Sequence, residues 1–288
     1  MKNLLLIDAN SLIHRCFHAL PPFTGPNGQP TGSLYGLANI LLKILREQQP
    51  EFIVVFFDRP EPTFRKEIFE EYKIHRPKAP SELVSQIIEA HNLFEAFGIK
   101  IYELAGYEAD DLIAVAALNF KKIPDIKIVI LTGDSDLLQL VEDDKIMVET
   151  IKKGISETII YNEASVEERY EGLKPKQLPD YKGLVGDVSD NILGVPSIGP
   201  KTAIPIIKEY GSLENFLENG QLNKNYSKII KFKDQALLSK KLGTLRCDVP
   251  INIEDVSELK YKDLPKENLI SYFEKLGFKN LINRLTSN

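Results

Sequence analysis

The first half of the chain alternates short apolar runs with longer segments in which apolar residues recur every three or four positions. The short runs are rich in Leu, Ile, Val and Phe and lie at residues 4–7, 52–57 and 126–131. They predict buried strands of a parallel sheet. The longer segments have the spacing of helices and lie at residues 34–46, 83–97 and 112–120. This alternation predicts right-handed crossovers and an α/β fold in which helices cover both faces of the sheet.

Beyond about residue 175 the pattern changes, because strand-like runs become scarce and helical spacing dominates. The expected helices lie at residues 180–185, 201–210, 213–217, 235–242 and 267–276. We therefore expect two parts, an α/β core over residues 1–175 and a helical C-terminal subdomain over residues 176–288. The boundary is placed by the change of pattern alone.

Composition narrows the classes of function only a little. The longest apolar runs are too short to cross a membrane, and the N-terminal run is too short for a signal peptide. The two cysteines, Cys16 and Cys247, form no Cys-x-x-Cys pair, which argues against a zinc site built from cysteines. Two cysteines are compatible with a reduced, cytoplasmic setting. The net charge of −5 argues mildly against a nucleic-acid binder. That argument weakens if many acids share one metal site.

The positions of the acids are the most informative feature of the sequence. Asp8 and Asp58 end the first two predicted strands, and Asp134 and Asp136 follow the third. Because ligands bind outside the carboxyl ends of parallel strands, these acids should lie on one edge of the sheet. Five further acids belong to the start of the helix at 112–120 or to a loop after a later helix, namely Glu108, Asp110, Asp111, Asp187 and Asp190.

Each acid alone has an ordinary structural explanation, as a helix N-cap or as a first-turn residue favoured by the helix dipole. Together they would repel one another strongly in a partly dry cleft. Divalent cations would remove that repulsion. Oxygen ligands without His or Cys favour Mg²⁺ or Mn²⁺ over zinc. More carboxylates than one ion needs indicate two ions, roughly 3.5–4 Å apart, which is the arrangement that promotes in-line phosphoryl displacement.

Eight segments then follow one another from Met1 to near the C-terminus. They read LLLIDANSLIHRCFHAL, GSLYGLANIL, VVFFD, FRKEIFEEYKIHRP, GYEADDLIA, ILTGDSDLLQLV, LVGDVSDNILGVPSIGPKTA and YFEKLGFKNL. A lone DxD is weak evidence, but GYEADD, TGDxD and GDxSDN in this order are highly specific. Together they resemble the 5′-nuclease family, which includes the N-terminal nuclease domain of bacterial DNA polymerase I, phage 5′-exonucleases and, more distantly, flap endonucleases. The implied fold is a PIN-like (resolvase-like) core, here in a free-standing form.

The resemblance implies that the acids bind two Mg²⁺ ions, with Mn²⁺ as a substitute. The first ion would be held by Asp8, Asp58, Glu108 and Asp110. The second would be held, in part through water, by Asp110, Asp111, Asp134, Asp136, Asp187 and Asp190. The residues implied as catalytic are Asp8, Asp110, Asp134, Lys73 and Arg76. In the implied reaction, water activated by one ion attacks phosphorus, and the other ion stabilises the leaving 3′-oxygen.

Residues of about 62–95 resemble the arch under which a single strand passes in this family. Lys73 would contact the scissile phosphate, Arg76 would be a second phosphate contact, and Tyr72 would stack on a base near the cut. Arg65 and Lys66 would also bind DNA. A solvated amphipathic helix is the ordinary alternative for such a basic segment.

Residues of about 184–210 resemble the family's helix–hairpin–helix, whose turn presents backbone N–H groups to a phosphate. The DNA contacts implied here are Gly194, Ile198, Gly199, Lys201 and Thr202, with a monovalent cation such as K⁺ bound at the hairpin. Pro205 falls inside the expected second helix and would be tolerated in its first turn. An ordinary helix–helix turn is the alternative.

The function implied is a structure-specific 5′-3′ exonuclease or flap endonuclease of DNA replication and repair, removing RNA primers or flaps. Its products would carry a 5′-phosphate and a 3′-hydroxyl. The expected partners are 5′ flaps, nicked or branched duplexes and single-stranded 5′ ends, bound by a monomer in a bacterial, nucleoid-associated setting and not at a membrane. Two alternatives stay open: a PIN-like ribonuclease and a non-catalytic binder of branched DNA. Exonuclease and flap-endonuclease preference are not distinguished.

Overall fold

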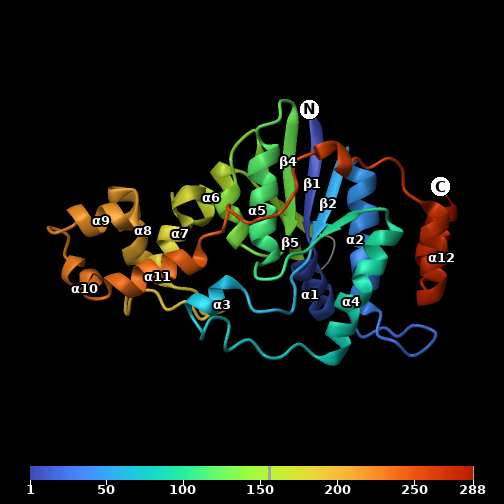
Figure 1. Cartoon of the computed structure of the whole chain (residues 1–288), viewed down its shortest axis with the longest axis horizontal. Coiled ribbons are helices and arrows are strands. Elements are labelled where there is room, and N and C mark those ends of the chain that lie inside the picture. The colour runs from blue at the N-terminus through green and yellow to red at the C-terminus, as the bar shows by residue number, and fades with distance from the viewer. Residues whose placement is uncertain (155–156, 288) are drawn as a thin grey trace.

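The computed structural model describes residues 1–154 and 157–287. Within these residues the centre of the molecule is a six-stranded sheet in the order β3-β2-β1-β4-β5-β6 (Figure 1). The strands are β1 (Lys2–Asp8), β2 (Phe52–Phe56), β3 (Lys100–Tyr102), β4 (Ile126–Thr132), β5 (Ile146–Lys153) and β6 (Glu157–Tyr161). Strands β1 to β5 pair in parallel, and β6 pairs with β5 in the antiparallel direction. The predicted α/β class with a mainly parallel sheet is confirmed.

The register places the ends of three central strands at one edge of the sheet. Asp8 lies beside Phe56 of β2, and Ile7 lies beside Leu131 of β4. The acids that follow these strands therefore begin from neighbouring positions, as the sequence predicts. Strands β3, β5 and β6 were not predicted. Strand β3 is three residues long, and β5 and β6 both carry Glu and Thr among their apolar residues.

Helices cover both faces of the sheet because successive strand residues point to opposite sides. Leu5 and Ile7 of β1 pack with one group of helices, α1 (Ala9–Ala19), α2 (Gly32–Gln48) and α4 (Ser81–Ala96). Leu4 and Leu6 pack with α5 (Ala109–Phe120) on the other face. The predicted helices at 34–46, 83–97 and 112–120 are confirmed as α2, α4 and α5, with ends shifted by a few residues. Short helical segments add α3 (Phe64–Ile68), η1 (Asp136–Leu140), η2 (Pro175–Gln177) and η3 (Val256–Leu259).

A helical arm extends from one side of the core (Figure 1). It contains α7 (Leu178–Val185), α8 (Pro200–Tyr210), α9 (Leu213–Asn219), α10 (Tyr226–Lys231) and α11 (Lys233–Gly243), next to α6 (Glu163–Arg169). Ile207, Leu213 and Phe216 are fully buried in its own hydrophobic cluster. Helices predicted here are confirmed, but α8 begins at Pro200, so Pro205 lies inside the helix and not in its first turn. Its exposed position lets the ring face solvent.

The C-terminal segment does not belong to this arm, which corrects the expected grouping of residues 176–288. Helices α12 (Lys266–Leu276) and α13 (Lys279–Thr286) pack against the α/β core at the end remote from the arm (Figure 1). Leu269, Phe273 and Leu281 are fully buried there, in the cluster that also contains α2 and α4. An amphipathic pattern reveals that a helix is covered, but it does not reveal which surface covers it. None of the helices in the described ranges is long and apolar enough to cross a membrane.

Phe273→Ala should destabilise the whole α/β core. Removal of a fully buried phenyl ring leaves a cavity between α12 and α4, and costs about 3–5 kcal/mol. The free energy of unfolding in urea measures the effect. The fully exposed Leu222 gives the control, since Leu222→Ala should change stability by less than about 0.5 kcal/mol. Equal stabilities of the two variants would show that α12 is not part of the core.

Candidate active site

The two acids that end β1 and β2 are fixed by short hydrogen bonds. Asp8 is the N-cap of α1 and accepts from the Ser11 N–H at 3.1 Å, and it accepts at 2.6 Å from the Thr132 hydroxyl at the end of β4. Asp58 accepts at 2.7 Å from the Ala109 N–H at the start of α5. The Asp58 N–H in turn donates to the Asn10 side chain at 3.0 Å. These contacts tie the strand ends to the first turns of two helices.

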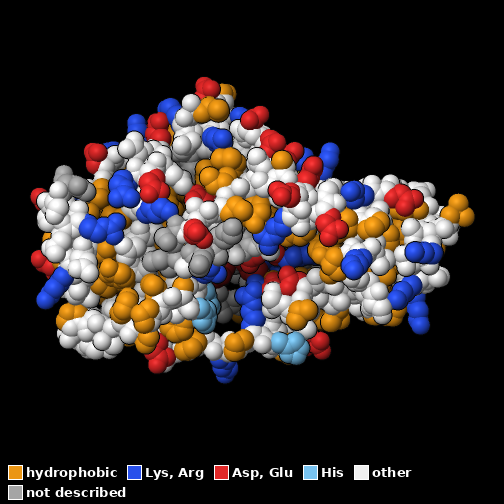
Figure 2. Space-filling view, turned by 180° about the vertical axis from the view of Figure 1, so that it is seen from behind, with side chains coloured by type: hydrophobic (Ala, Val, Ile, Leu, Met, Phe, Trp, Pro, Cys, Tyr) orange, Lys and Arg blue, Asp and Glu red, His pale blue; other side chains and the backbone are white. Residues whose placement is uncertain are grey.

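These acids line a cavity of about 410 Å³ between the sheet edge and the segment after α3. Its lining residues are Asp8, Asn10, Ser11, His14, Asp58, Lys73, Arg76, Glu108, Asp110, Gly133, Asp134, Ser135 and Ser189. Figure 2 shows acidic side chains set back in a hollow there, with basic side chains at its edge. Five of the nine acids identified in the sequence therefore meet in one cavity, together with both basic residues implied as catalytic.

The acids in the cavity disfavour one another's charge. Burial raises the pKa of Asp8 to about 7, with further contributions from Asp58 and Asp134. Burial also raises the pKa of Asp110 well above its usual range, and the nearby Asp134 and Asp8 raise it further. The pKa of Asp58 is raised by burial and by Glu108. In the part of the chain that the structure describes, no basic side chain forms an ion pair with Asp8, Asp58, Asp110 or Asp134. Only Asp58 feels a partial compensation, because Lys73 and Arg76 lower its pKa from a distance.

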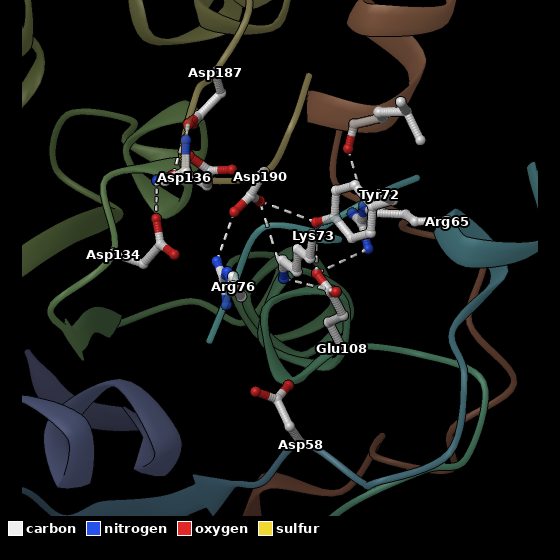
Figure 3. A network of polar contacts seen from close by, with 12 residues as sticks. Asp58, Arg65, Tyr72, Lys73, Arg76, Glu108, Asp134, Asp136, Asp187 and Asp190 are labelled. Atoms are coloured by element: carbon white, nitrogen blue, oxygen red, sulfur yellow. Dashed lines mark hydrogen bonds and ion pairs between the residues drawn. The ribbon is translucent and has the colours of Figure 1, made fainter. Parts of the chain in front are cut away.

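The other acids have basic partners (Figure 3). Lys73 Nζ lies 2.7 Å from Glu108 Oε1, and an Arg76 nitrogen lies 2.5 Å from Asp190 Oδ1. Lys182 of α7 pairs with both Asp136 and Asp187, the latter at 2.8 Å. Burial raises the pKa of Asp136 to about 6 although Lys182 lowers it in part. Burial also acts to raise the pKa of Asp187, but Lys182 and Ser189 outweigh it and hold that pKa at about 2.

Three ammonium or guanidinium groups thus occupy carboxylate oxygens that the sequence assigns to metal binding. Among the described residues, no three acidic, His or Cys side chains are arranged closely enough to form a ready-made metal site. The donor chemistry still fits a hard divalent cation, because every acid at the cavity offers oxygen and the four without a counterion repel one another.

Asp111 and Arg65 form an internal ion pair, which corrects two of the expectations from the sequence. Asp111 is fully buried, Arg65 is 2% exposed, and two guanidinium nitrogens lie 2.7 and 2.8 Å from its carboxylate oxygens. Arg65 also donates to the carbonyl oxygen of Leu242 at 2.9 Å. In this structure Asp111 does not line the cavity and Arg65 is not available to DNA, because each is the counterion of the other.

Tyr72 is also buried, whereas the sequence implies an exposed aromatic ring that stacks on a base. It is 3% exposed, and its hydroxyl lies 3.0 Å from Asp190 Oδ2 and 3.2 Å from Glu108 Oε2. The Lys66 ammonium donates to the Tyr72 carbonyl. Between α3 and α4 the expected arch therefore lies against the loop after α7, where the Lys73 N–H donates to the Asp190 carbonyl at 2.9 Å. Lys73 has a φ of 56°, a left-handed conformation at which this bond forms.

The expected helix–hairpin–helix is present as α7, a turn and α8. Gly186 and Gly194 lie back to back, with φ values of 79° and 60°, and a Cβ on Gly194 would lie 2.4 Å from the Gly186 nitrogen. Only glycine fits such an approach. Gly199 is the N-cap of α8, Lys201 is exposed, and Thr202 is half-buried. Ile198 is buried beneath the turn, so a DNA contact there can involve only its backbone.

Sequence reasoning missed several residues of the site. Lys182 forms ion pairs with Asp136 and Asp187. The only feature of the sequence that could have indicated this role is its position five residues before Asp187. Thr132 and Asn10 orient Asp8 and Asp58, and no pattern in the sequence assigns them that role. His14 also lines the cavity, and burial together with the nearby His18 and Arg76 lowers its pKa.

Comparisons with known proteins identify the family of the chain. Residues 3–171 match the family model described as 5′-3′ exonuclease, N-terminal resolvase-like domain, and residues 173–267 match 5′-3′ exonuclease, C-terminal SAM fold. A 5′-3′ exonuclease of Aquifex aeolicus is 36% identical over 98% of this chain and 94% of its own length. DNA polymerase I of Bacillus subtilis is 43% identical over 99% of this chain, which spans only 32% of that polymerase.

Solved structures share the fold at lower sequence identity. The 5′-exonuclease of bacteriophage T5, described with bound divalent metal ions, has a TM-score of 0.67 at 21% identity and covers 99% of this chain and 97% of its own. The catalytic core of Rad2 in complex with DNA substrate has a TM-score of 0.61 at 20% identity and covers 98% and 90%. These structures share the fold, whereas the two family models and the Aquifex relative show that the chain belongs to the 5′-3′ exonuclease family of nucleases.

Proposed function

We propose that this chain hydrolyses phosphodiester bonds of DNA at 5′ flaps and 5′ ends, with divalent metal ions, and leaves a 5′-phosphate and a 3′-hydroxyl. One observation carries the proposal: carboxylates from the ends of β1, β2 and β4 and from α5 share a cavity with Lys73 and Arg76. The flap endonuclease of bacteriophage T5 and the Rad2 core have been solved with DNA, which supports a DNA substrate.

Two Mg²⁺ ions are the cofactor that this site fits best, with Mn²⁺ as a substitute. The first ion would be held by Asp8, Asp58, Glu108 and Asp110, and the second by Asp110, Asp134, Asp136, Asp187 and Asp190. Asp111 is not included among the proposed ligands of the second ion, because Arg65 neutralises its charge. When bound, such ions supply an activated water and neutralise charge that develops on the phosphate. The raised pKa values of Asp8 and Asp110 support the proposal, since a cation would stabilise both carboxylates.

Lys73 and Arg76 would bind the phosphate beside the cut. Their present partners, Glu108 and Asp190, are also proposed metal ligands. A metal ion at those carboxylates would free both cations to face the substrate. The turn of residues 194–199 would contact the duplex through backbone N–H groups, with K⁺ as a further proposed ligand of this turn.

Asp134→Ala and Asp8→Ala should each abolish Mg²⁺-dependent cutting of a 5′-labelled flapped duplex, because each removes an oxygen donor from the cavity. Product release from the flap is followed on a denaturing gel, and Mg²⁺ binding by calorimetry. Glu254→Ala is the control, because Glu254 is exposed and does not line the cavity. This variant should cut the flapped duplex like the parent. Full activity in either aspartate variant would contradict the assignment.

Lys73→Ala should slow the single-turnover cut by about 100-fold or more, because a positive charge at the reacting phosphate is removed. Metal binding should remain intact, since the change also frees Glu108 from its ion pair. Lys78→Ala, an exposed lysine of the same segment, should leave the rate unchanged. An unaltered rate for Lys73→Ala under single-turnover conditions would remove Lys73 from the mechanism.

In EDTA, Asp8→Asn should become more stable relative to the parent as the pH rises from about 5 to about 8. The pKa of Asp8 is 3.8 as an ordinary carboxyl and about 7 in the fold, so the folded chain binds this proton more tightly. The resulting stability is complete below the lower pKa and is lost as the pH rises through the higher one. The difference in Tm between variant and parent measures it. Asp187→Asn is the control, because its pKa of about 2 predicts no change over this range. A pH-independent difference for Asp8→Asn would show that Asp8 is not held in a charge-disfavouring site.

A further inference from the structure

The charge of the helical arm differs in sign from that of the whole chain. Residues 220–241 contain six lysines and one acid, Asp234, whereas the full sequence has a net charge of −5. Figure 2 shows Lys and Arg side chains along the arm. Of these lysines only Lys240 forms an ion pair in the described part of the chain, with Asp180 at 2.5 Å and Glu214 at 2.6 Å. The excess charge is therefore exposed to solvent and available to a partner.

Four of these lysines lie around the junction of α10 and α11. Lys228 and Lys231 are three residues apart and so share one face of α10. Lys224 precedes that helix, and Lys233 begins α11. Lys224, Lys231 and Lys233 are exposed and Lys228 is half-buried. We call these four residues the distal lysine surface.

The distal lysine surface is joined to the hairpin turn by hydrogen bonds from α11. Gln235, two residues after Lys233, donates to the Gly194 carbonyl, and Ser239 accepts from the Gly194 N–H at 3.0 Å. The helix that begins at Lys233 therefore fixes the turn that would bind a phosphate. A backbone that contacts the turn would find further positive charge at a position set by the same helix.

The chemistry of this surface suits duplex DNA better than a single strand. Non-specific binding of single strands relies on exposed aromatic rings on which bases stack. The two aromatic residues here, Tyr226 and Phe232, are partly buried and pack in the hydrophobic cluster of the arm. The Tyr226 hydroxyl donates to the Leu217 carbonyl at 3.0 Å, which fixes the ring inward. What remains is positive charge on a folded scaffold, and such charge contacts phosphates without reading the sequence.

We propose that Lys224, Lys228, Lys231 and Lys233 bind the phosphate backbone of the duplex, as a second contact beyond the hairpin turn. The inference rests on the proposed function, and it assigns the duplex contact to residues outside the cavity. It predicts that the chain holds a longer stretch of duplex than the turn alone would reach.

The test uses the full chain with all four lysines changed to Gln. Binding to a fluorescent flapped duplex is measured by anisotropy in EDTA over a series of salt concentrations. Affinity at moderate salt should fall by about tenfold or more, and the slope of log K against log salt should drop by about 0.9 for each phosphate that the variant no longer neutralises. The parent should bind long duplex arms more tightly than shortened ones, and the variant should show no such preference.

The matched control changes four exposed lysines at the opposite end of the molecule to Gln, namely Lys262, Lys266, Lys275 and Lys279. It should retain the parent's affinity, salt slope and length preference. Urea titration first checks that the variant of the distal lysine surface is folded. If that folded variant binds duplex as tightly as the parent, the distal lysine surface is not a DNA contact. An equal loss of affinity for single strands would overturn its assignment to duplex. If the parent binds DNA but never cuts it, the proposed function is contradicted. The binding measurements would still decide whether the distal lysine surface contacts duplex DNA.

Discussion

Repulsion between carboxylates is the constraint on which the site depends. A parallel sheet delivers the residues that follow its strands to one edge, and here those residues are acids. The fold tolerates them in two ways. Glu108, Asp136, Asp187 and Asp190 are neutralised by Lys73, Arg76 and Lys182. Asp8, Asp58 and Asp110 keep no such partner and have raised pKa values. The acids thus form a compensated group and an uncompensated group, and a cation is needed most by the latter.

The Arg65–Asp111 pair solves a different problem, which is to hold three parts of the chain together. Arg65 comes from the base of the arch segment, Asp111 from the first turn of α5, and the Leu242 and Thr244 carbonyls from the end of α11. The Arg246 N–H donates to the same aspartate. Loss of one member of a buried pair leaves the other uncompensated, which is why such pairs cost about 3–5 kcal/mol to break. This buried pair therefore joins the arm, the arch segment and the acid-bearing helix.

Much of this arrangement could be predicted from the sequence, and the reasons are local. A short apolar run that ends in Asp8, Asp58 or Asp134 identifies both a strand and the edge at which its acid lies. Arg65 and Tyr72 could not be placed, because a basic or aromatic residue looks the same in sequence whether it faces solvent or a buried partner. The packing of α12 on the core could not be predicted either. The pattern around Phe273 predicts that this residue is buried, but it does not indicate which surface covers it. Strands β5 and β6 were not predicted because polar residues interrupt their apolar pattern.

The contacts between the arch segment and Asp190 have a thermodynamic consequence. The Tyr72 hydroxyl, the Arg76 guanidinium and the Lys73 N–H all contact this one residue. Whatever draws these groups away from Asp190 leaves its carboxylate more open to a cation, and a cation there weakens their hold in return. Such linkage is reciprocal, so under the proposed function a strand that draws these groups away and an ion that binds Asp190 would strengthen each other's binding by the same factor. The two ligands would then be loaded cooperatively through a single aspartate.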